Sequence, residues 1–344
     1  MSEPMTSAER VRTAMAFRQP DRVPFVLPAH MHAARRLGLG IRECLETPRH
    51  VVAAQLHLLD WLGHDIVSAA PPAAFEVEPW GGTVEFDEAG PPVAGPPPLR
   101  PQDIARLEPP RLEDSPRLMG TLEAIADLRA RVGDRVPVAG GVVSPFSLPV
   151  LQLGFESYLE VMLERPLDFG RLMEVNVAHS LEWARAQVRA GATALAYADP
   201  VASTDVVPLE TAREKAMAVA RRILPEIGVP CIFSLASGRA LPLVDDLVRL
   251  GAMAVGVSAQ ENLGEAVERC FGRIGVVGNL NALAMCSWST ADAESAALLA
   301  LWAAGTGGGW MLADNHGEIP YPVPDDVLTT IAETVKSRGG AALS

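Results

Sequence analysis

Short apolar runs alternate with longer stretches of helical character along most of the chain. The runs predicted to form strands span residues 22–27, 64–68, 136–143, 194–198, 230–234, 252–257, 274–278 and 309–313. The stretches predicted to form helices span residues 6–17, 49–62, 119–132, 166–190, 209–227, 241–250, 263–271, 291–305 and 325–336. Nearly continuous apolar strands separated by helices are typical of a parallel sheet with both faces covered.

The repetition of strand and helix favours a closed barrel over an open sheet. It predicts the α/β class and a (β/α)8 TIM barrel, formed as a single domain over residues 1–344. The alternative is an open, doubly wound sheet. No Gly-x-Gly-x-x-Gly motif opens a helix after the first strand, so a dinucleotide-binding version of that fold is not expected.

Residues 71–118 interrupt this rhythm, and prolines cluster there. Between the proline clusters, residues 75–78 and 83–86 alternate apolar and polar side chains, as the strands of a surface β-hairpin do. The segment holds too few apolar residues for a core of its own. We therefore predict a Pro-rich β-hairpin excursion after the second strand, not a separate domain.

Composition narrows the class of partner. The net charge of −13 argues against sequence-independent binding to nucleic acid, which needs a basic surface. No apolar run has the length of a transmembrane helix, and the first residues are polar and charged, unlike a signal peptide. The four cysteines are scattered without Cys-x-x-Cys spacing, so neither a disulfide framework nor a zinc knuckle is expected. These features predict a cytoplasmic protein that acts on a small molecule.

Polar residues follow nearly every predicted strand. In a TIM barrel the reacting groups lie at the carboxyl ends of the strands. The candidate catalytic residues are His30, Asp199 and His316. The candidate substrate-binding residues are His32, Ser144, Ser203, Asp205, Ser234, Ser237, Asn279, Asn281, Asn315 and Glu318. Because turn formation alone also places Asn, Asp and Ser after strands, the set predicts a site better than any single member does.

The two early histidines raise the question of a metal. His30 and His32 alternate, so on an extended segment they would face the same way and could form a metal-binding pair. The simpler interpretation is one ligand-binding histidine and one surface histidine. A Ser-His-Asp triad lacks support because no Gly-x-Ser-x-Gly motif is present. No metal ligand is therefore assigned.

Several segments carry a resemblance to a known family. They are Ala-Glu-Arg-Val-Arg-Thr-Ala-Met (8–15), Gln-Pro-Asp-Arg-Val-Pro (19–24), Gly-Gly-Val-Val-Ser-Pro-Phe (140–146), Ala-Asp-Pro-Val-Ala-Ser-Thr-Asp (198–205), Gly-Asn-Leu-Asn (278–281) and Glu-Ile-Pro-Tyr-Pro-Val-Pro-Asp-Asp-Val-Leu (318–328). Together they resemble the uroporphyrinogen decarboxylase superfamily over nearly the whole chain, most of all its corrinoid-linked methyltransferases of the methylcobalamin:coenzyme M type. The resemblance implies a (β/α)8 barrel with its pocket at the strand carboxyl ends.

The resemblance also implies a metal site that this sequence lacks. The methyltransferases of the family carry His-x-Cys-Gly after strand five and a further Cys after strand eight, and these residues bind a zinc ion that activates the accepting thiol. The corresponding positions here are Leu235, Ser237 and Gly317, the last beside His316. Zinc-thiol chemistry is therefore not expected there. A relocated metal held by His30, His32, His316 and a carboxylate is the less favoured alternative.

The decarboxylase pattern also departs. The family's decarboxylases have an Arg-rich loop after strand one for propionate groups, an Asp after strand two for pyrrole N–H groups, and a Tyr after strand three. Residues 27–36 and 68–72 match neither of the first two, and no Tyr lies near residues 148–153. Only His316 corresponds to a late family histidine, with an offset of one residue. A porphyrinogen substrate is not expected.

Three hypotheses follow. The first is a methyl- or alkyl-transferring enzyme without the zinc-thiol site, with His316 or His30 as the acid–base group and Asp199 orienting the substrate. Its methyl donor would be a corrinoid, and its partner a corrinoid protein. The second is a decarboxylase or lyase that acts on a small carboxylic acid, with a histidine protonating a carbanion. The third is a non-catalytic ligand-binding barrel.

Overall fold

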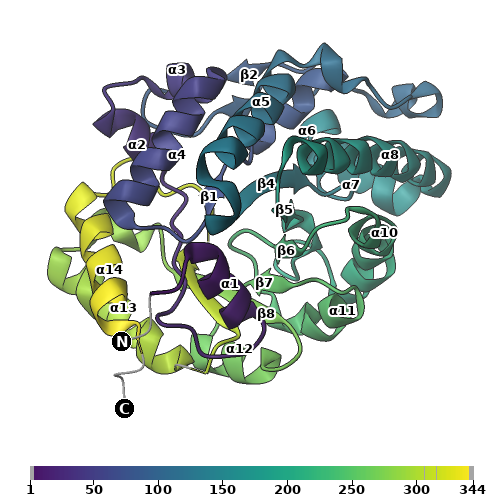
Figure 1. Ribbon diagram of the computed structural model, residues 1–344. Coiled ribbons are helices and arrows are strands. Elements are labelled where there is room, and N and C mark those ends of the chain that lie inside the picture. The colour runs from purple at the N-terminus through teal and green to yellow at the C-terminus, as the bar shows by residue number, and fades with distance from the viewer. Residues whose placement is uncertain (1–3, 306, 315, 341–344) are drawn as a thin grey trace.

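The computed structural model describes residues 4–305, 307–314 and 316–340, and its centre is a curled parallel sheet (Figure 1). The strands lie in the order β1 (Val67–Ser68), β4 (Val138–Val143), β5 (Ala194–Ala198), β6 (Cys231–Ser234), β7 (Ala254–Gly256), β8 (Gly275–Leu280) and β9 (Trp310–Asp314). Each pairs in parallel with the next. The chain thus has the predicted α/β class and a TIM-barrel-like arrangement.

The first predicted strand joins the two edges of this sheet without forming a regular strand. Phe25 makes an isolated parallel bridge with Leu312 of β9. Its carbonyl accepts a hydrogen bond from Asp65 N, just before β1, at 2.9 Å. Pro24 and Pro28 lack the N–H groups that a strand between two neighbours would donate. Only one bridging residue therefore remains of that prediction.

Helices surround the outer side of the sheet (Figure 1). They are α1 (Ser7–Met15), α2 (His30–Arg36), α3 (Ile41–Glu46), α4 (Pro48–Leu62), α5 (Pro116–Val132), α6 (Leu148–Leu153), α7 (Phe155–Glu164), α8 (Pro166–Ala190), α9 (Leu209–Thr211), α10 (Met217–Ile223), α11 (Val244–Arg249), α12 (Leu263–Cys270), α13 (Thr290–Ala304) and α14 (Asp325–Arg338). Nearly all predicted helices are present. The short helices α2, α3, α6 and α7 were not predicted.

Helix α1 lies at the amino ends of the strands, near the middle of the ring in Figure 1. Gly309 N donates to Ala14 O at 2.7 Å. A Cβ at Gly275 would lie 2.7 Å from Met15 Sδ, and one at Gly309 would lie 2.7 Å from the Phe17 ring. Met15 and Phe17 therefore pack against this end of the barrel.

The Pro-rich excursion differs from its prediction. Residues Ala73–Trp80 form a 3-10 helix, η1, in place of the expected strand at 75–78. Phe75 N donates to Pro72 O at 2.9 Å, so the backbone hydrogen bonds are satisfied locally. A short antiparallel pair does form, between β2 (Val84–Glu85) and β3 (Val93–Ala94). The expected hairpin between 75–78 and 83–86 is thus wrong.

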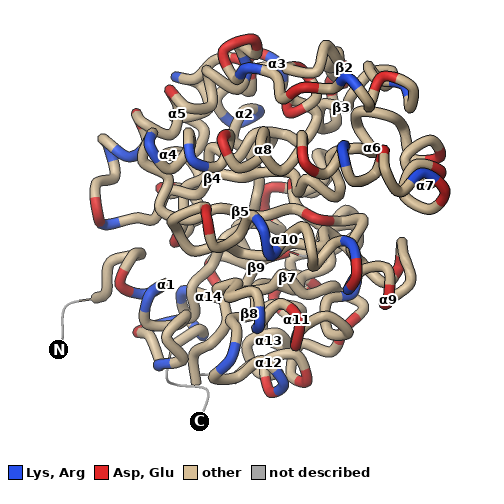
Figure 2. The backbone as a smooth tube through the Cα atoms, turned by 90° about the vertical axis from the view of Figure 1, so that its right-hand side faces the viewer, with Lys and Arg blue, Asp and Glu red and all other residues tan. Residues whose placement is uncertain are grey.

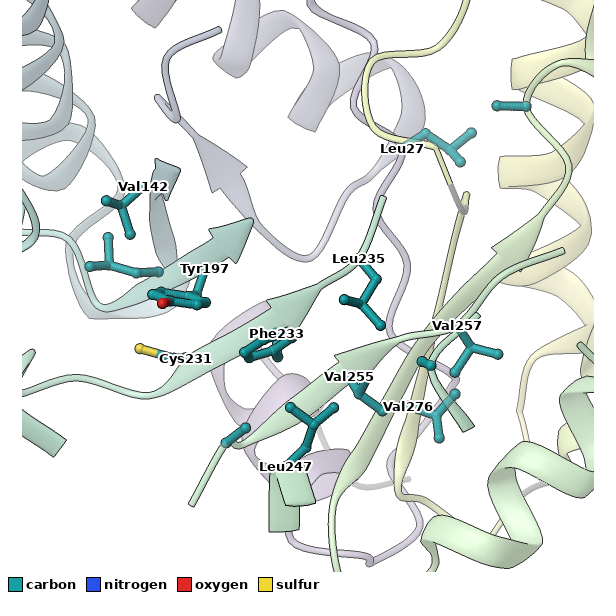
Figure 3. Close-up of a cluster of buried hydrophobic side chains, with 14 of the residues drawn as sticks. Leu27, Val142, Tyr197, Cys231, Phe233, Leu235, Leu247, Val255, Val257 and Val276 are labelled. Carbon is teal, nitrogen blue, oxygen red and sulfur yellow. The ribbon is translucent and has the colours of Figure 1, made fainter. Parts of the chain in front are cut away.

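The two faces of the sheet have different surroundings. Positions in register on neighbouring parallel strands point to the same side, as do every second residue along a strand. Tyr197, Phe233, Val255 and Val276 are in register and fully buried. Figure 3 shows them in one cluster, which also contains Leu247 of α11. This face is the packed core between the sheet and the outer helices, and the opposite face lines the interior of the barrel.

Positions of basic and acidic residues are both spread along the surrounding helices and loops (Figure 2). Among the described residues, none of the helices combines the length and the apolar character needed to cross a bilayer.

Candidate active site at the strand carboxyl ends

The structure brings Ser237 and His316 together. Ser237 follows β6 and His316 follows β9, and Ser237 Oγ is hydrogen-bonded to His316 Nδ1. His316 is exposed and Ser237 is partly exposed at this end of the barrel. They stand at or beside two of the three positions that the family resemblance assigns to metal ligands, although they lie 79 residues apart in the chain. The fold therefore brings these two positions together across the mouth of the barrel.

Asp314 holds the loop that carries His316. Its Oδ2 accepts hydrogen bonds from His316 N at 2.6 Å and from Gly317 N at 2.8 Å. Burial raises the pKa of Asp314 to about 7, although both N–H groups lower it. Gly317 has a φ of 116°, in the region that favours glycine, so this tight loop depends on it. The backbone at His316 is thereby anchored while its ring stays exposed.

His30 lies mostly buried at the first residue of α2. Its Nδ1 is 2.9 Å from Glu318 Oε2, and its Nε2 is 3.2 Å from Ser68 O. Burial lowers the pKa of His30, but the charge and hydrogen bond of Glu318 raise it to above its ordinary value overall. A carbonyl and a carboxylate both accept, so the doubly protonated imidazolium satisfies the two contacts. Glu318 is itself positioned by Met31 N, which donates to Oε1 at 2.8 Å.

We expect Glu318→Gln to lower the pKa of His30. The amide keeps an acceptor for Met31 N but removes the negative charge, and burial then dominates. The measurement is an NMR titration of the histidine ring nitrogens in wild type and variant. An unchanged His30 titration would show that Glu318 does not stabilise the imidazolium.

His32 does not share a face with His30, contrary to expectation. Both residues lie on α2, where a separation of two residues turns the side chain by about 200°. His32 is fully buried, with Nε2 3.1 Å from Val323 O, and burial lowers its pKa. His32 therefore packs against the segment that precedes α14. The pair therefore cannot act as two neighbouring metal ligands.

Asp199 is fully buried and lies beside two serines. Ser147 Oγ donates to Asp199 Oδ1 at 2.6 Å, and Ser144 Oγ accepts from Ser147 N at 2.8 Å. Burial raises the pKa of Asp199 to about 6, opposed by the hydroxyls of Ser147 and Ser144. Asp199 shares the parity of Tyr197 in the core, so it supports the loops after β4 and β5 from behind. Its predicted direct role at the mouth is not favoured by this placement.

Ser203 and Asp205 form a second rim contact. Asp205 accepts from Arg239 N at 2.8 Å and from Arg239 Nε at 2.9 Å, while Ser203 Oγ donates to its Oδ2 at 3.2 Å. The Arg239 contacts lower the pKa of Asp205. A Cβ at Gly238 would lie 2.3 Å from Ser203 Oγ, so Gly238 permits the close approach of the two loops.

The remaining candidates mostly organise loops. Asn279 Nδ2 donates to Ser258 O and Glu261 O, each at 2.9 Å. Ser234 Oγ accepts from Ala236 N, and Asn281 Oδ1 accepts from Ala284 N. Asn315 lies outside the described residues.

Sequence reasoning gave no role to Ser147 or Arg239, and it left Asp314 out of the candidate site. Ser147 and Arg239 hold their carboxylates only across loops far apart in the chain. For Asp314 the signal was available, because its Asp-x-His-Gly context is typical of a carboxylate that accepts from the following backbone N–H groups.

The residues at the family's zinc positions do not fit a zinc-thiolate centre. Leu235 is apolar and only 1% exposed, Ser237 offers a neutral hydroxyl, and Gly317 has no side chain. Nor do the described residues place three or more His, Cys, Asp or Glu side chains so that they could hold a metal ion. The relocated site of His30, His32, His316 and a carboxylate is not assembled among them.

Comparison with known proteins settles the family. The uroporphyrinogen decarboxylase (URO-D) model matches residues 6–338. The chain belongs to the uroporphyrinogen decarboxylase family. This assignment agrees with the resemblance carried by the sequence segments, and with the position of the polar residues at the strand carboxyl ends.

Relatives of this chain include enzymes with two different activities. The chain is 27% identical over 168 residues to the methylcobamide:CoM methyltransferase MtaA of Methanosarcina barkeri, covering 48% of this chain and 49% of that protein. It is 28% identical over 253 residues to the uroporphyrinogen decarboxylase of Bordetella petrii, covering 69% and 68%. The chain thus spans about half the length of the methyltransferase it matches.

A solved structure supports the fold across the whole chain. A methyltransferase from Methanosarcina mazei superposes with a TM-score of 0.87, at 21% identity, covering 97% of this chain and 99% of that one. At this identity the likeness bears on the fold alone. The URO-D relatives are enzymes, which makes the site at the strand carboxyl ends a candidate active site.

Proposed function

We propose that this protein transfers a methyl or alkyl group between a carrier and a small polar substrate, with His316 as the acid–base group. The contact between Ser237 Oγ and His316 Nδ1 carries this proposal. When Nδ1–H donates to Ser237, the other ring nitrogen, Nε2, keeps a lone pair at the exposed side of the ring. That nitrogen can take a proton from an acceptor hydroxyl or thiol.

The proposed transfer balances in atoms and electrons without a metal ion at this site. The acceptor loses its proton to His316 and attacks the methyl carbon, and the carrier departs with the electron pair of the broken bond to carbon. A corrinoid is the proposed carrier, on a partner protein or free, because methylcobamide is the donor named for one relative. The neutral Ser237 orients the imidazole, as an ordering partner does in other acid–base pairs. His30, with both ring nitrogens engaged by protein acceptors, holds the loop of Glu318 beside it.

The test is methyl transfer from methylcobalamin to small thiols and alcohols, followed by the cobalamin absorbance. His316→Ala is expected to lower kcat about 100-fold, since a positioned acid–base group contributes on that order. Ser237→Ala should have a smaller effect. His57→Ala is the matched control, because His57 lies on the outer helix α4 and contacts Arg36.

Two results would contradict the proposal. Wild-type activity in His316→Ala would show that His316 is not the acid–base group. Loss of wild-type activity on treatment with a strong zinc chelator would show that the transfer depends on a metal.

A second candidate, a lyase acting on a small carboxylic acid, is favoured by the two acceptors that face the ring nitrogens of His30. A buried imidazolium can attract a carboxylate or return a proton to a carbanion, after a change of its present partners. Release of carbon dioxide from small acids in the absence of a corrinoid would support this candidate over methyl transfer.

A further inference from the structure

The interior face of the barrel is partly exposed, in contrast to the packed outer face. Along β5 every second residue is partly exposed, while Leu195 and Tyr197 between them are fully buried. The alternation recurs along β6, whereas interior positions of β4, β7 and β9 include buried residues, among them Gly141, Ala254, Met311 and Ala313. The partly exposed interior residues are Val26, Ser68, Ala139, Ala194, Ala196, Ala198, Ile232, Ser234, Gly256, Val277 and Asn279. Barrels of this type usually fill their interior with bulky branched side chains, which would leave little exposure there.

Two glycines on opposite faces differ in the room beside them, although the interior face is crowded at Gly141 of β4, where a Cβ would lie 2.8 Å from Ala70 Cβ. Gly140 of β4 faces α8, and a Cβ there would lie 2.2 Å from Gln187 Oε1 and 2.6 Å from Leu195 Cδ2. Gly256, at the end of β7, faces the interior. A Cβ at Gly256 would meet nothing closer than 3.8 Å. A side chain can therefore be added at Gly256 where none can be added at Gly140.

The walls of this interior carry no charge. All the partly exposed interior residues named above are apolar or neutral polar, and the polar ones, Ser68, Ser234 and Asn279, belong to the carboxyl halves of their strands. At the other end, Met15 packs against Gly275. A charged group that left water to enter here would find no counter-charge, which is costly. An uncharged group would lose little and gain contact with the walls.

We propose that the barrel interior is an uncharged well that receives the apolar group of the substrate, and that Gly256 sets how far this group enters. The substrate would place its polar end at the rim, near Ser237 and His316, and its apolar end between β6, β7 and β8. The identity of the bound group rests on the proposed function, whereas the existence of the well does not.

The first test asks whether the interior is open, using an introduced thiol. Gly256→Cys is made in a Cys286→Ser background, because Cys286 is the exposed cysteine and the other three are buried. The chain is treated with methyl methanethiosulfonate, which is small and neutral, and with its sulfonatoethyl analogue, which is anionic. The thiolate displaces the sulfinate and forms a mixed disulfide, so mass spectrometry counts the modified residues.

We expect the introduced thiol to react with the neutral reagent at least about 10-fold faster than with the anionic one. Cys231 is the matched control, since it lies on the neighbouring strand β6 but faces the packed side. If the introduced thiol reacts no faster than Cys231, the interior is packed and the proposal is wrong. Equal rates with the two reagents would show that the well does not discriminate against a charged group.

The second test measures occupancy in the methyl-transfer assay. Gly256→Leu should keep the melting temperature of wild type and lower kcat/KM at least about 10-fold, because its side chain fills the space that the substrate needs. Gly170→Ala, at an open position on α8, controls for an added side chain elsewhere. Unchanged kcat/KM in Gly256→Leu would show that the well is not part of the site. If wild type transfers no methyl group, the proposed function fails, and the thiol experiment still decides whether the well exists.

Discussion

Asp65→Ala is expected to destabilise the protein by about 3–5 kcal/mol, because it breaks a buried ion network. Asp65 is fully buried. Its Oδ1 accepts from Arg10 and its Oδ2 from Arg22, each at 2.6 Å. Oδ2 also accepts from Phe25 N at 2.9 Å, and Asp65 N donates back to Phe25 O at the same distance.

The position of this network explains the size of the effect. Asp65 connects helix α1 to the segment that closes the barrel between β9 and β1. Alanine would leave Arg22 and the Phe25 N–H buried without the carboxylate, and the remaining Asp21 would hold Arg10 alone. Urea unfolding followed by circular dichroism measures the change in free energy of unfolding.

The matched control is Asp127→Ala, which removes an Asp–Arg pair from an exposed helix surface. Asp127 is paired with Arg131 one turn along α5, where solvent screens the interaction. Little change is expected there. A similarly small change in Asp65→Ala would show that the network does not hold the closing segment.

Glu76→Gln is expected to stabilise the protein at alkaline pH and to leave it nearly unchanged at pH 4. Glu76 is buried in η1, and burial raises its pKa to about 8, although Val143 N donates to Oε1 at 2.8 Å and lowers it. The carboxyl group is therefore neutral in the folded chain up to about pH 8, whereas in the unfolded chain it ionises near 4.5.

The sign follows from proton binding. Between these two pKa values the folded state holds a proton that the unfolded state has lost, so stability falls as the pH rises through this window. Each pH unit contributes about 1.4 kcal/mol, which amounts to about 4 kcal/mol by pH 8. Glutamine keeps an oxygen that accepts from Val143 N, and it cannot ionise. The stability of the variant therefore does not fall over this pH range.

Urea unfolding at pH 4, 6 and 8 measures the difference between Glu76→Gln and wild type. Glu85→Gln, on the exposed strand β2, should leave the unfolding midpoint nearly unchanged at each pH. A difference that does not grow with pH would show that Glu76 is ionised in the folded protein.

The predicted strands and helices largely agree with the structure where local pattern and tertiary packing favour the same conformation. Strand β5 and helix α8 have the predicted bounds, because each combines strong periodicity with clear ends. The segment 75–78 shows the opposite case. Its alternation is that of a strand, but Pro72 and Pro79 flank it and a 3-10 helix satisfies its backbone locally.

The candidate site could be located by sequence but not assembled by it. The position of polar residues after strands predicted that the site lies at one end of the barrel, since parallel strands end at one edge. Which of them meet was decided by loops. The His30 segment became a helix, which separated His30 from His32 and brought His30 to Glu318, 288 residues away.

By itself, the sequence determined the α/β class, the order of most elements, the family and the loss of the zinc-ligand residues at Leu235, Ser237 and Gly317. These are properties of local pattern and of residue identity. Only the tertiary structure decided that Ser237 meets His316, that Asp199 lies behind the site, and that a Cβ at Gly256 would meet nothing closer than 3.8 Å. These depend on the side to which each strand residue points and on the path of the loops, and such long-range geometry is set by packing of the whole barrel.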